Sequence, residues 1–166
     1  MKSVLFLGAG KPANNEPPFG LNLTSKNTTI MDWLLSLFPK GSYKRLFAGG
    51  YEIEKFRHKY QDLKIYENEF WKETSPTSSL FLLINNLKKG VIVSYTDILF
   101  RKSLVKRFEN KSNEFDVVIA VDSNWRLRFN RVSKNDLEQS EFVSCVGKNV
   151  ESLHFSYQKF LSTDEF

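Results

Sequence analysis

Two aspartates that follow apolar runs are the residues of this sequence with the clearest potential for chemistry. Asp97 comes soon after the run Val91–Tyr95, and Asp122 ends a later run. A carboxylate at the end of a buried strand either caps the helix that follows or holds a hard cation such as Mg²⁺. From its position alone, Asp97 could cap a helix that begins at Ile98 or bind a metal, and both interpretations stay open. Asp122 is interpreted as a turn residue.

A short glycine-rich loop follows the first apolar run of the chain. It has the sequence Leu7-Gly8-Ala9-Gly10-Lys11. Glycines at the end of a strand let backbone N–H groups approach phosphate, and a lysine supplies the countercharge. The loop matches neither GxGxxG nor GxxxxGK(S/T), so neither a dinucleotide-binding site nor a P-loop is indicated. By itself the loop is as compatible with a plain turn as with a phosphate-binding loop.

Further candidates stand close to the ends of the other apolar runs. In a parallel sheet, ligands collect at the carboxyl ends of the strands. The candidates there are Gly50, Asn68 and Tyr95, and Thr74, Ser75 and Ser79 belong to a polar loop that caps the next helix. Polar side chains of this kind suit either a pyrimidine or a purine, so they do not fix the base of a nucleotide ligand.

Short apolar runs alternate with helical patterns along most of the chain, which is the rhythm of βαβ units. The runs predict strands at residues 4–7, 43–48, 63–66, 91–95 and 115–121. The helical period predicts helices at residues 53–60, 80–87 and 98–108. Strands joined by helices imply a mainly parallel sheet covered on both faces. We therefore expect an α/β protein with a three-layer α/β/α, Rossmann-like fold, in which the strand 91–95 is central and buried.

Residues 29–38 form the clearest predicted helix. Apolar residues recur there with the spacing of one buried helix face. Thr29, with Asp32 three residues later, resembles a capping box. Near the other end of the chain, two apolar runs within residues 141–155 flank Gly147 and predict a C-terminal β-hairpin.

The composition favours a globular protein of the cytoplasm. Hydrophobic residues make up 41% of the chain and aromatic residues 14%, enough for a packed core. The one cysteine, Cys145, excludes an intramolecular disulfide and favours a reducing compartment, and we interpret it as a packed thiol. No apolar run approaches the about 20 residues that span a bilayer, and the first run is too short for a signal peptide. We therefore expect a soluble, cytoplasmic protein with no membrane partner.

The net charge of +5 invites a nucleic-acid interpretation. Lysines are spread along the chain, however, and the short basic cluster of Arg101-Lys102 with Lys106-Arg107 is typical of a solvated helix face. We therefore expect no nucleic-acid partner. A basic protein that binds nucleic acid or a lipid surface is the least favoured alternative. A small positive net charge also suits a protein whose ligand is a nucleoside triphosphate, because it attracts anions.

The order of these features resembles the nucleotidyltransferase family of sugar-nucleotide pyrophosphorylases, and more narrowly its phosphocholine and aminoethylphosphonate cytidylyltransferase branch. Each shared motif is short, but together they cover nearly the whole chain. The family's motifs are matched in order by Leu7–Gly10, Gly50-Tyr51, Asn68 with Ser79-Leu80, Thr96-Asp97 and Val121–Arg126.

This resemblance implies an activity. A nucleoside monophosphate, with CMP as the expected one, would be transferred from a nucleoside triphosphate to a small phosphate or phosphonate acceptor, with release of pyrophosphate. The loop Gly8–Lys11 would cradle the triphosphate, with Lys11 as a catalytic residue, and residues 74–79 would lie near the base. Asp97 would be both a catalytic residue and the ligand of Mg²⁺, and the resemblance favours this role over capping. Positioning and charge neutralisation would supply the rate.

The chain also departs from the family pattern. Pro12 and Ala13 replace a glycine and an arginine, and Thr96 replaces a glycine. The family's Pro-Lys pair aligns with Pro18-Phe19, which removes a phosphate-binding cation that Lys26 could replace. The alternative to an enzyme is therefore a catalytically impaired nucleotide-binding or regulatory domain of the same fold.

Members of this family are commonly longer, with a second metal carboxylate on a later strand. We expect a single nucleotidyltransferase-like domain over residues 1–166 that is cut short at its C-terminal end, either as a piece of a longer protein or as a shortened relative. The identity of the acceptor and the oligomeric state stay open. The hairpin within residues 141–155 could be the contact of a homodimer or a lid.

Overall fold

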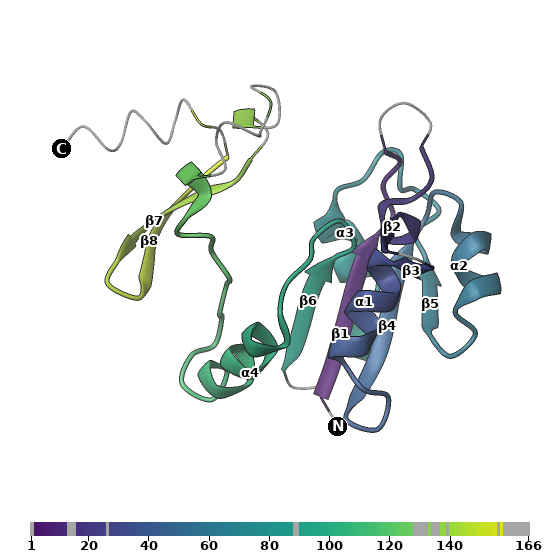
Figure 1. Ribbon diagram of the computed structural model, residues 1–166, viewed down its shortest axis with the longest axis horizontal. Coiled ribbons are helices and arrows are strands. Elements are labelled where there is room, and N and C mark those ends of the chain that lie inside the picture. Colours follow the sequence, from purple (N-terminus) through teal and green to yellow (C-terminus); the bar gives the residue numbers. More distant parts are fainter. Residues whose placement is uncertain are drawn as a thin grey trace. The chain divides into compact units, whose positions relative to one another are not determined.

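The computed structural model describes residues 2–12, 16–25, 27–87, 90–127, 133, 137–138, 140–155 and 157 (Figure 1). The chain divides into two compact units, Met1–Val118 and Ile119–Phe166, and each is described by itself. This division by contacts does not by itself separate two domains, so the single domain over residues 1–166 stays a prediction. Among the described residues, no helix has both the length and the apolar character needed to cross a membrane.

The first unit is built on a parallel sheet of four strands. They are β1 (Lys2–Gly8), β4 (Tyr43–Gly49), β5 (Lys64–Glu67) and β6 (Val91–Tyr95), and their order in space is β5-β4-β1-β6. Figure 1 shows β1 between β4 and β6, and it pairs in parallel with both. The two inner strands carry long buried runs, residues 3–7 in β1 and 46–49 in β4, because a parallel strand with covered faces has no side exposed to water.

One face of this sheet is covered by three helices. Val4 and Phe6 of β1 point to this side and belong to one buried cluster. The cluster includes residues of α1 (Ile30–Leu37), α2 (Ile53–Lys59) and α4 (Lys102–Lys111). Aromatic rings fill much of it, so this layer supplies most of the apolar burial of the unit.

The opposite face is covered by a shorter layer. Leu5 and Leu7 alternate with the residues above and point to this side, where they pack with Leu83. This layer consists of α3 (Pro76–Phe81) and the 3₁₀ helix η3 (Ile84–Asn86). Helices therefore lie on both faces of an all-parallel sheet, and the predicted α/β/α, Rossmann-like fold is confirmed.

The helix α1 begins as its sequence predicts. Thr29 is the N-cap residue: its side chain accepts a hydrogen bond from the backbone N–H of Asp32, and its own backbone N–H donates to the Asp32 carboxylate at 2.9 Å. The predicted capping box is confirmed. A short antiparallel pair of β2 (Leu23–Ser25) and β3 (Thr28–Thr29) leads into the helix, preceded by the 3₁₀ helix η2 (Phe19–Leu21).

Two expectations about strands are wrong. β6 was expected in the centre of the sheet, but it is an edge strand of the sheet that the structure describes, and Val93 and Tyr95 are exposed. Residues 115–121 were expected to form a fifth strand, but they adopt no regular structure, and Val117 is 80% exposed. An apolar run indicates that a strand could form, but a strand also needs a partner for its backbone hydrogen bonds, which the run does not specify.

The boundaries of two helices also differ from the sequence-based ones. The helix expected over 98–108 begins at Lys102, and Thr96–Phe100 are not helical. The indole N–H of Trp33 donates to the backbone carbonyl of Phe100 at 3.0 Å, which holds this segment against α1. The helix expected over 80–87 starts earlier, at Pro76, and is divided into α3 and η3.

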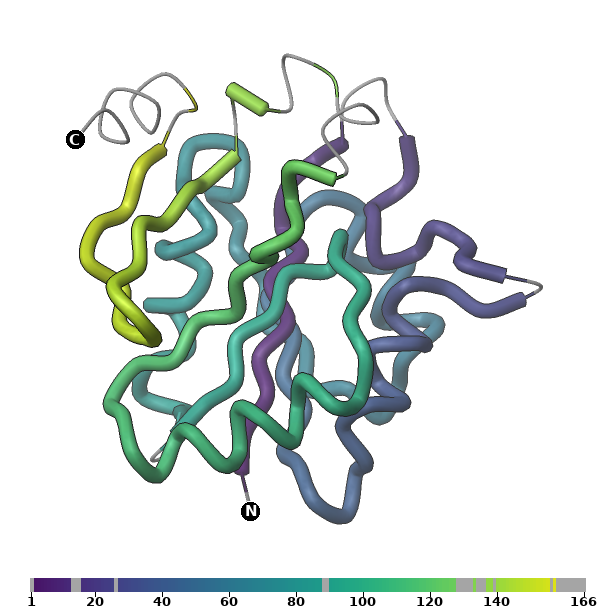
Figure 2. The backbone as a smooth tube through the Cα atoms, turned by 60° about the vertical axis from the view of Figure 1, so that its left-hand side comes forward, coloured from purple at the N-terminus to yellow at the C-terminus, as the bar shows by residue number. Residues whose placement is uncertain are grey.

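The second unit contains the predicted hairpin. β7 (Phe142–Val146) and β8 (Asn149–His154) pair antiparallel, and Gly147 in the turn has φ +62°, a conformation that glycine adopts without strain (Figure 2). Phe142 packs edge-to-face against Trp125 in a small aromatic cluster. Cys145 on β7 is exposed, so the expectation of a packed thiol is wrong.

Candidate functional site

The carboxyl ends of the four parallel strands are joined by backbone hydrogen bonds that continue beyond the strands. The N–H of Tyr51 donates to the carbonyl of Ala9 at 2.9 Å, and that of Asn68 donates to Gly49 at 2.8 Å. On the other side of β1, the N–H of Thr96 donates to Leu7 at 3.2 Å. The loops that follow the strands are therefore held next to one another, at the edge where a parallel sheet collects its ligands.

A cavity of about 250 Å³ lies at this edge, within the first unit. Every residue that the sequence analysis named for the site, except Gly50, lines it. These are Leu7, Gly8, Ala9, Gly10, Lys11, Asn68, Thr74, Ser75, Ser79, Tyr95 and Asp97. Four further residues line it: Phe19, Trp71, Pro76 and Thr96. Trp71 was not named from the sequence at all, because no motif or strand end marks it.

Asp97 has a free carboxylate at this cavity. Its capping alternative is wrong, because α4 begins at Lys102 with Arg101 as its N-cap residue. Asp97 is exposed and makes no hydrogen bond or ion pair with any residue that the structure describes. Such a carboxylate fits Mg²⁺, which usually takes one or two protein carboxylates and completes its shell with water and phosphate oxygens.

The rest of a metal site would have to come from the ligand. No group of three or more His, Cys, Asp or Glu side chains that could hold a metal occurs in the part of the chain that the structure describes. A metal held at Asp97 therefore needs further oxygen ligands from water or from a bound phosphate. This requirement matches the way in which Mg²⁺ enters sites together with a nucleoside triphosphate.

The glycine loop brings one cation to the cavity. Lys11 is exposed, and its ammonium lies 5.6 Å from the centre of the Tyr51 ring, within the range of a cation–π contact. A Cβ atom on Gly10 would meet no atom within 4 Å, so the loop is open on that side of Gly10. The loop can therefore present backbone N–H groups and a positive charge to an anion from the same side.

Gly8 is required for a different reason. A Cβ atom there would lie 2.6 Å from Oγ1 of Thr96 and 2.9 Å from the ring of Phe47. The side chain of Thr96 is 4% exposed and occupies the space that a side chain at position 8 would need. Thr96 therefore fills the space that the missing side chain of Gly8 leaves at the cavity.

Asn68 holds the far wall of the cavity together. Its side-chain amide donates to Oγ1 of Thr74 at 2.9 Å and to Oγ of Ser79 at 3.0 Å, and its carbonyl accepts from the N–H of Phe70 at 3.1 Å. Both N–H bonds of this amide are used within the protein. Asn68 therefore positions the turn of residues 68–74, and its amide N–H groups are not available to a ligand.

Trp71 is carried on that turn. Its backbone N–H donates to the carbonyl of Asn68 at 3.2 Å, and its ring meets the ring of Tyr51 edge-on, with centroids 5.6 Å apart. A Cβ atom on Gly50 would lie 2.6 Å from Cβ and Cγ of Trp71. Gly50 does not line the cavity, but it allows Trp71 to pack directly on the backbone at the end of β4.

Phe19 lines the cavity. The resemblance to nucleotidyltransferases predicts a lysine at this position. The side chain of Phe19 is 42% exposed and carries no charge. Lys26, the residue that could replace this cation, lies outside the described residues. Among the described residues that line the cavity, Lys11 is the one that is positively charged.

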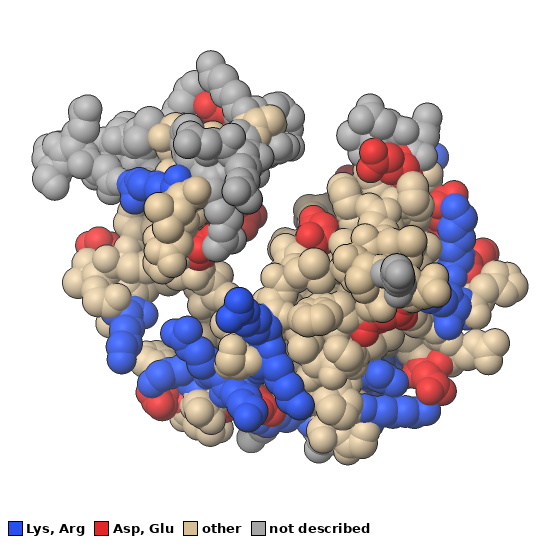
Figure 3. All heavy atoms as spheres, in the orientation of Figure 1, with Lys and Arg blue, Asp and Glu red and all other residues tan. Residues whose placement is uncertain are grey.

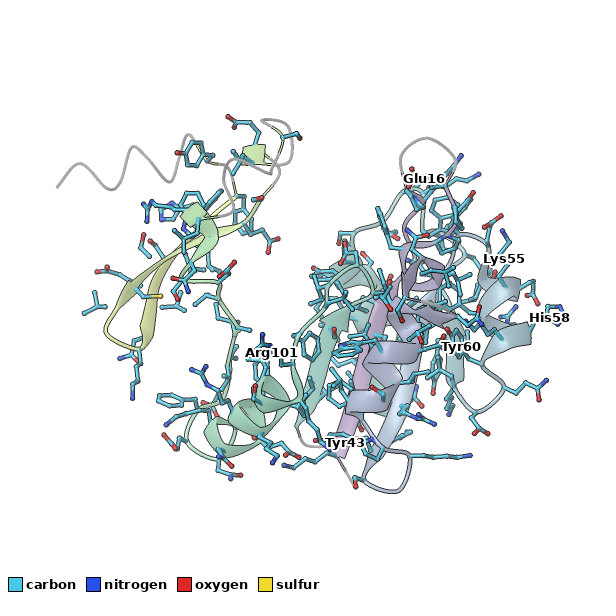
Figure 4. The ribbon with its side chains drawn as sticks, in the orientation of Figure 1. Glu16, Tyr43, Lys55, His58, Tyr60 and Arg101 are labelled. Carbon is cyan, nitrogen blue, oxygen red and sulfur yellow. The ribbon has the colours of Figure 1, made fainter. Side chains whose placement is uncertain are left out.

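A larger hollow of about 550 Å³ lies at the C-terminal end of α2, around Asp32, Arg45, His58 and Lys59. Figure 4 shows His58 and Tyr60 at this end, well away from Arg101 at the start of α4. Two of the charged groups of this hollow are paired with each other: Lys59 contacts Asp32 at 3.0 Å. The pKa of Asp32 is lowered although burial alone would raise it, because the Thr29 backbone and Lys59 donate to it. This hollow is also remote from the strand ends, so we regard the smaller cavity as the candidate site.

The basic cluster on α4 is fully exposed. Figure 3 shows lysine and arginine side chains gathered over this helix, and Arg101, Lys102, Lys106 and Arg107 are all exposed. This exposure matches the solvated helix face that the sequence predicts.

Comparison with models of known protein families and with curated proteins finds no match for this chain. The functional conclusion therefore rests on the geometry of the cavity and on the resemblance of its motifs.

Proposed function

We propose that this protein is a nucleotidyltransferase that binds a nucleoside triphosphate, CTP first among them, in the cavity at the strand ends. It transfers the nucleoside monophosphate to a small phosphate or phosphonate acceptor and releases pyrophosphate. One observation carries the proposal: three segments that follow the strands β1, β5 and β6 line one cavity, namely the loop Gly8–Lys11, the residues Thr74, Ser75, Pro76 and Ser79, and Asp97. These are the residues to which the resemblance gives the triphosphate, the base and the metal.

The reaction asks little covalent work of the protein. An oxygen of the acceptor attacks the α-phosphorus, the bond from that phosphorus to the bridging oxygen breaks, and pyrophosphate leaves with the electron pair. Lys11 and the backbone N–H groups of Gly8–Gly10 stabilise the negative charge of the triphosphate. Asp97 would hold Mg²⁺, which would supply charge neutralisation for the phosphates.

A second candidate is a nucleotide-binding domain with the same ligand and impaired catalysis. Two observations favour it. Phe19 lines the cavity where the family has a lysine, and Asp97 is not part of a cluster of metal-ligating residues in the described chain. Both features weaken charge neutralisation during transfer more than they weaken binding, because charge builds up on the leaving pyrophosphate. A cytoplasmic location belongs to both candidates, since it supplies nucleoside triphosphate and keeps the exposed Cys145 reduced.

Calorimetric titration tests the shared part of these candidates. CTP with Mg²⁺ is expected to bind the wild-type protein, and Asp97→Ala is expected to weaken binding about tenfold or more and to remove its dependence on Mg²⁺. ATP, GTP and UTP, titrated in parallel, establish the base. If none of the four triphosphates binds, both candidates fail together.

Pyrophosphate release separates the two candidates. Phosphocholine, aminoethylphosphonate and a sugar 1-phosphate are offered as acceptors with the triphosphate that binds best. Release that depends on the acceptor and is abolished in Asp97→Ala supports the enzyme. Tight binding of the triphosphate without release from any acceptor favours the impaired domain.

A further inference from the structure

Trp71 is a feature of the cavity that neither its motifs nor the proposed chemistry uses. It is half-buried and lines the cavity beside Ser75 and Pro76. Tryptophan has the largest aromatic face of any side chain, and planar ligands stack on such faces. Trp71 therefore borders the space that a ligand in the cavity would occupy.

The position of the ring is fixed from three directions. Gly50 lets the side chain lie against the backbone, since a Cβ atom there would be 2.6 Å from Cγ of Trp71. The ring of Tyr51 supports it edge-on, with an angle of 60° between the two planes. The turn anchored by Asn68 holds its backbone. A ring held in this way loses little conformational entropy when a ligand stacks on it, which favours binding.

The lining of the cavity combines charged groups with an aromatic one. Asp97 contributes a free carboxylate and Lys11 a cation, and the ring of Tyr51 contacts both the ammonium of Lys11 and the ring of Trp71. The cavity of about 250 Å³ is also smaller than the about 300–1,000 Å³ of sites that enclose a whole drug-sized ligand. It suits the base end of a nucleotide, with the phosphates extending along the glycine loop.

From this juxtaposition we infer that Trp71 is the platform on which the planar heteroaromatic base of the nucleotide stacks, and that Gly50 is the positioning residue that allows the platform. The inference rests on the proposed function, because it takes a nucleotide as the ligand. It goes further by assigning the recognition of the base to an aromatic face in place of the Asn68 amide. Stacking accepts any base, so Trp71 contributes affinity and the choice among bases falls to neighbouring polar groups.

Two ligands that differ only in the presence of the nucleoside test this role. CTP and inorganic tripolyphosphate, each with Mg²⁺, are titrated into wild type, Trp71→Ala and Trp71→Phe. Trp71→Ala is expected to weaken CTP about 5- to 150-fold and to leave tripolyphosphate unchanged, since stacking on an aromatic residue contributes about 1–3 kcal/mol per base. Trp71→Phe is expected to keep most of the CTP affinity. Equal losses for both ligands, or no loss for either, would overturn the inference.

Two further measurements keep the test independent of the stability of Trp71→Ala. In a Trp33→Phe, Trp125→Phe variant, Trp71 is the one remaining tryptophan, and its fluorescence should be quenched by CTP and not by tripolyphosphate. Gly50→Ala should displace the ring and weaken CTP selectively, whereas Gly41→Ala, where a Cβ meets nothing within 4 Å and which does not line the cavity, is the matched control. Fluorescence that does not respond while calorimetry shows CTP binding would contradict stacking on Trp71.

The outcomes also separate this inference from the proposed function. If wild type binds none of the four nucleoside triphosphates, the proposed function fails and the platform fails with it. If wild type binds CTP and Trp71→Ala binds it equally well, only the platform fails.

Discussion

At the scale of single residues, the cavity depends on positions where a side chain is absent. Gly8 leaves the space that Thr96 fills, and Gly50 leaves the space that Trp71 fills. Neither glycine has a positive φ, so a close approach of side chains, and not an unusual backbone conformation, requires them. Each glycine thus acts on the cavity through the larger residue that packs against it.

Gly8→Ala tests this relation between neighbouring residues. The added methyl group would meet Oγ1 of Thr96 at 2.6 Å and the ring of Phe47 at 2.9 Å, so we expect a loss of about 1–3 kcal/mol in the free energy of unfolding. Urea unfolding measures this loss. Gly8→Ala combined with Thr96→Ala should recover part of it, and Gly10→Ala should cost little. A fully stable Gly8→Ala protein would contradict the packing described.

The positions of the site residues could be predicted from the sequence, but their partners could not. Asn68 and Gly50 were both expected to contact a nucleotide because each follows an apolar run. Asn68 instead uses its amide N–H groups on Thr74 and Ser79, and Gly50 supports Trp71. Which atoms meet across a fold depends on the three-dimensional packing of separate loops, and the spacing of residues along the chain does not contain it.

At the scale of elements, α4 is tied to the sheet through one carboxylate. Glu109 accepts a hydrogen bond from the hydroxyl of Tyr43 on β4 and lies 3.3 Å from the ammonium of Lys2 on β1. The hydrogen bond from Tyr43, and next the contact with Lys2, hold the pKa of Glu109 below its ordinary value. The same contact raises the pKa of Tyr43, after the larger effect of burial.

The lowered pKa of Glu109 predicts a dependence of stability on pH. The folded state favours the ionised carboxylate, so this contribution is fully present above the pKa of an unfolded glutamate and is lost as the pH falls through the lower pKa of the folded state. Glu109→Gln should therefore cost about 1 kcal/mol near pH 7, a modest value because the side chain is partly exposed, and nothing at strongly acidic pH. Urea unfolding across the acidic range measures it. A cost that does not change with pH would contradict the assignment.

The sequence predicts which helices and strands exist better than it predicts how they are placed and paired in the fold. β1, β4, β5, β6 and the hairpin were expected within a few residues of their observed bounds, because apolar runs and turn residues are local signals. The place of β6 at the edge of the sheet was not predicted, since the order of strands depends on how crossovers return to the sheet. The run 115–121 has the same local signal as β6 but no strand forms there.

At the scale of the whole molecule, the boundary between the two compact units falls within this apolar segment, between Val118 and Ile119. Phe115, Val117, Ile119 and Val121 are all exposed, at 47%, 80%, 45% and 51%. Exposed segments without secondary structure are the preferred sites of proteolytic cleavage. The segment is therefore the junction of the two units and an accessible apolar stretch of the chain.

Limited proteolysis tests this description. Proteinase K, which cleaves after aliphatic and aromatic side chains, should cut first within residues 115–121, and mass spectrometry of the early fragments identifies the bond. Folded β1 and β4 should resist cleavage over the same period. Protection of this segment at a level similar to that of β1 would show that it is paired as a strand, as the sequence alone predicts.

The central claim concerns the place where a nucleoside triphosphate binds, and amide chemical shifts measured by NMR test it most directly. The 19.3 kDa chain is suited to residue-by-residue assignment. On titration with CTP and Mg²⁺, we predict shifts at Gly8–Lys11, Trp71, Thr74–Ser79 and Asp97, and none in the hollow around His58 and Lys59. Shifts confined to that hollow, or no saturable shifts with any nucleoside triphosphate, would contradict the account.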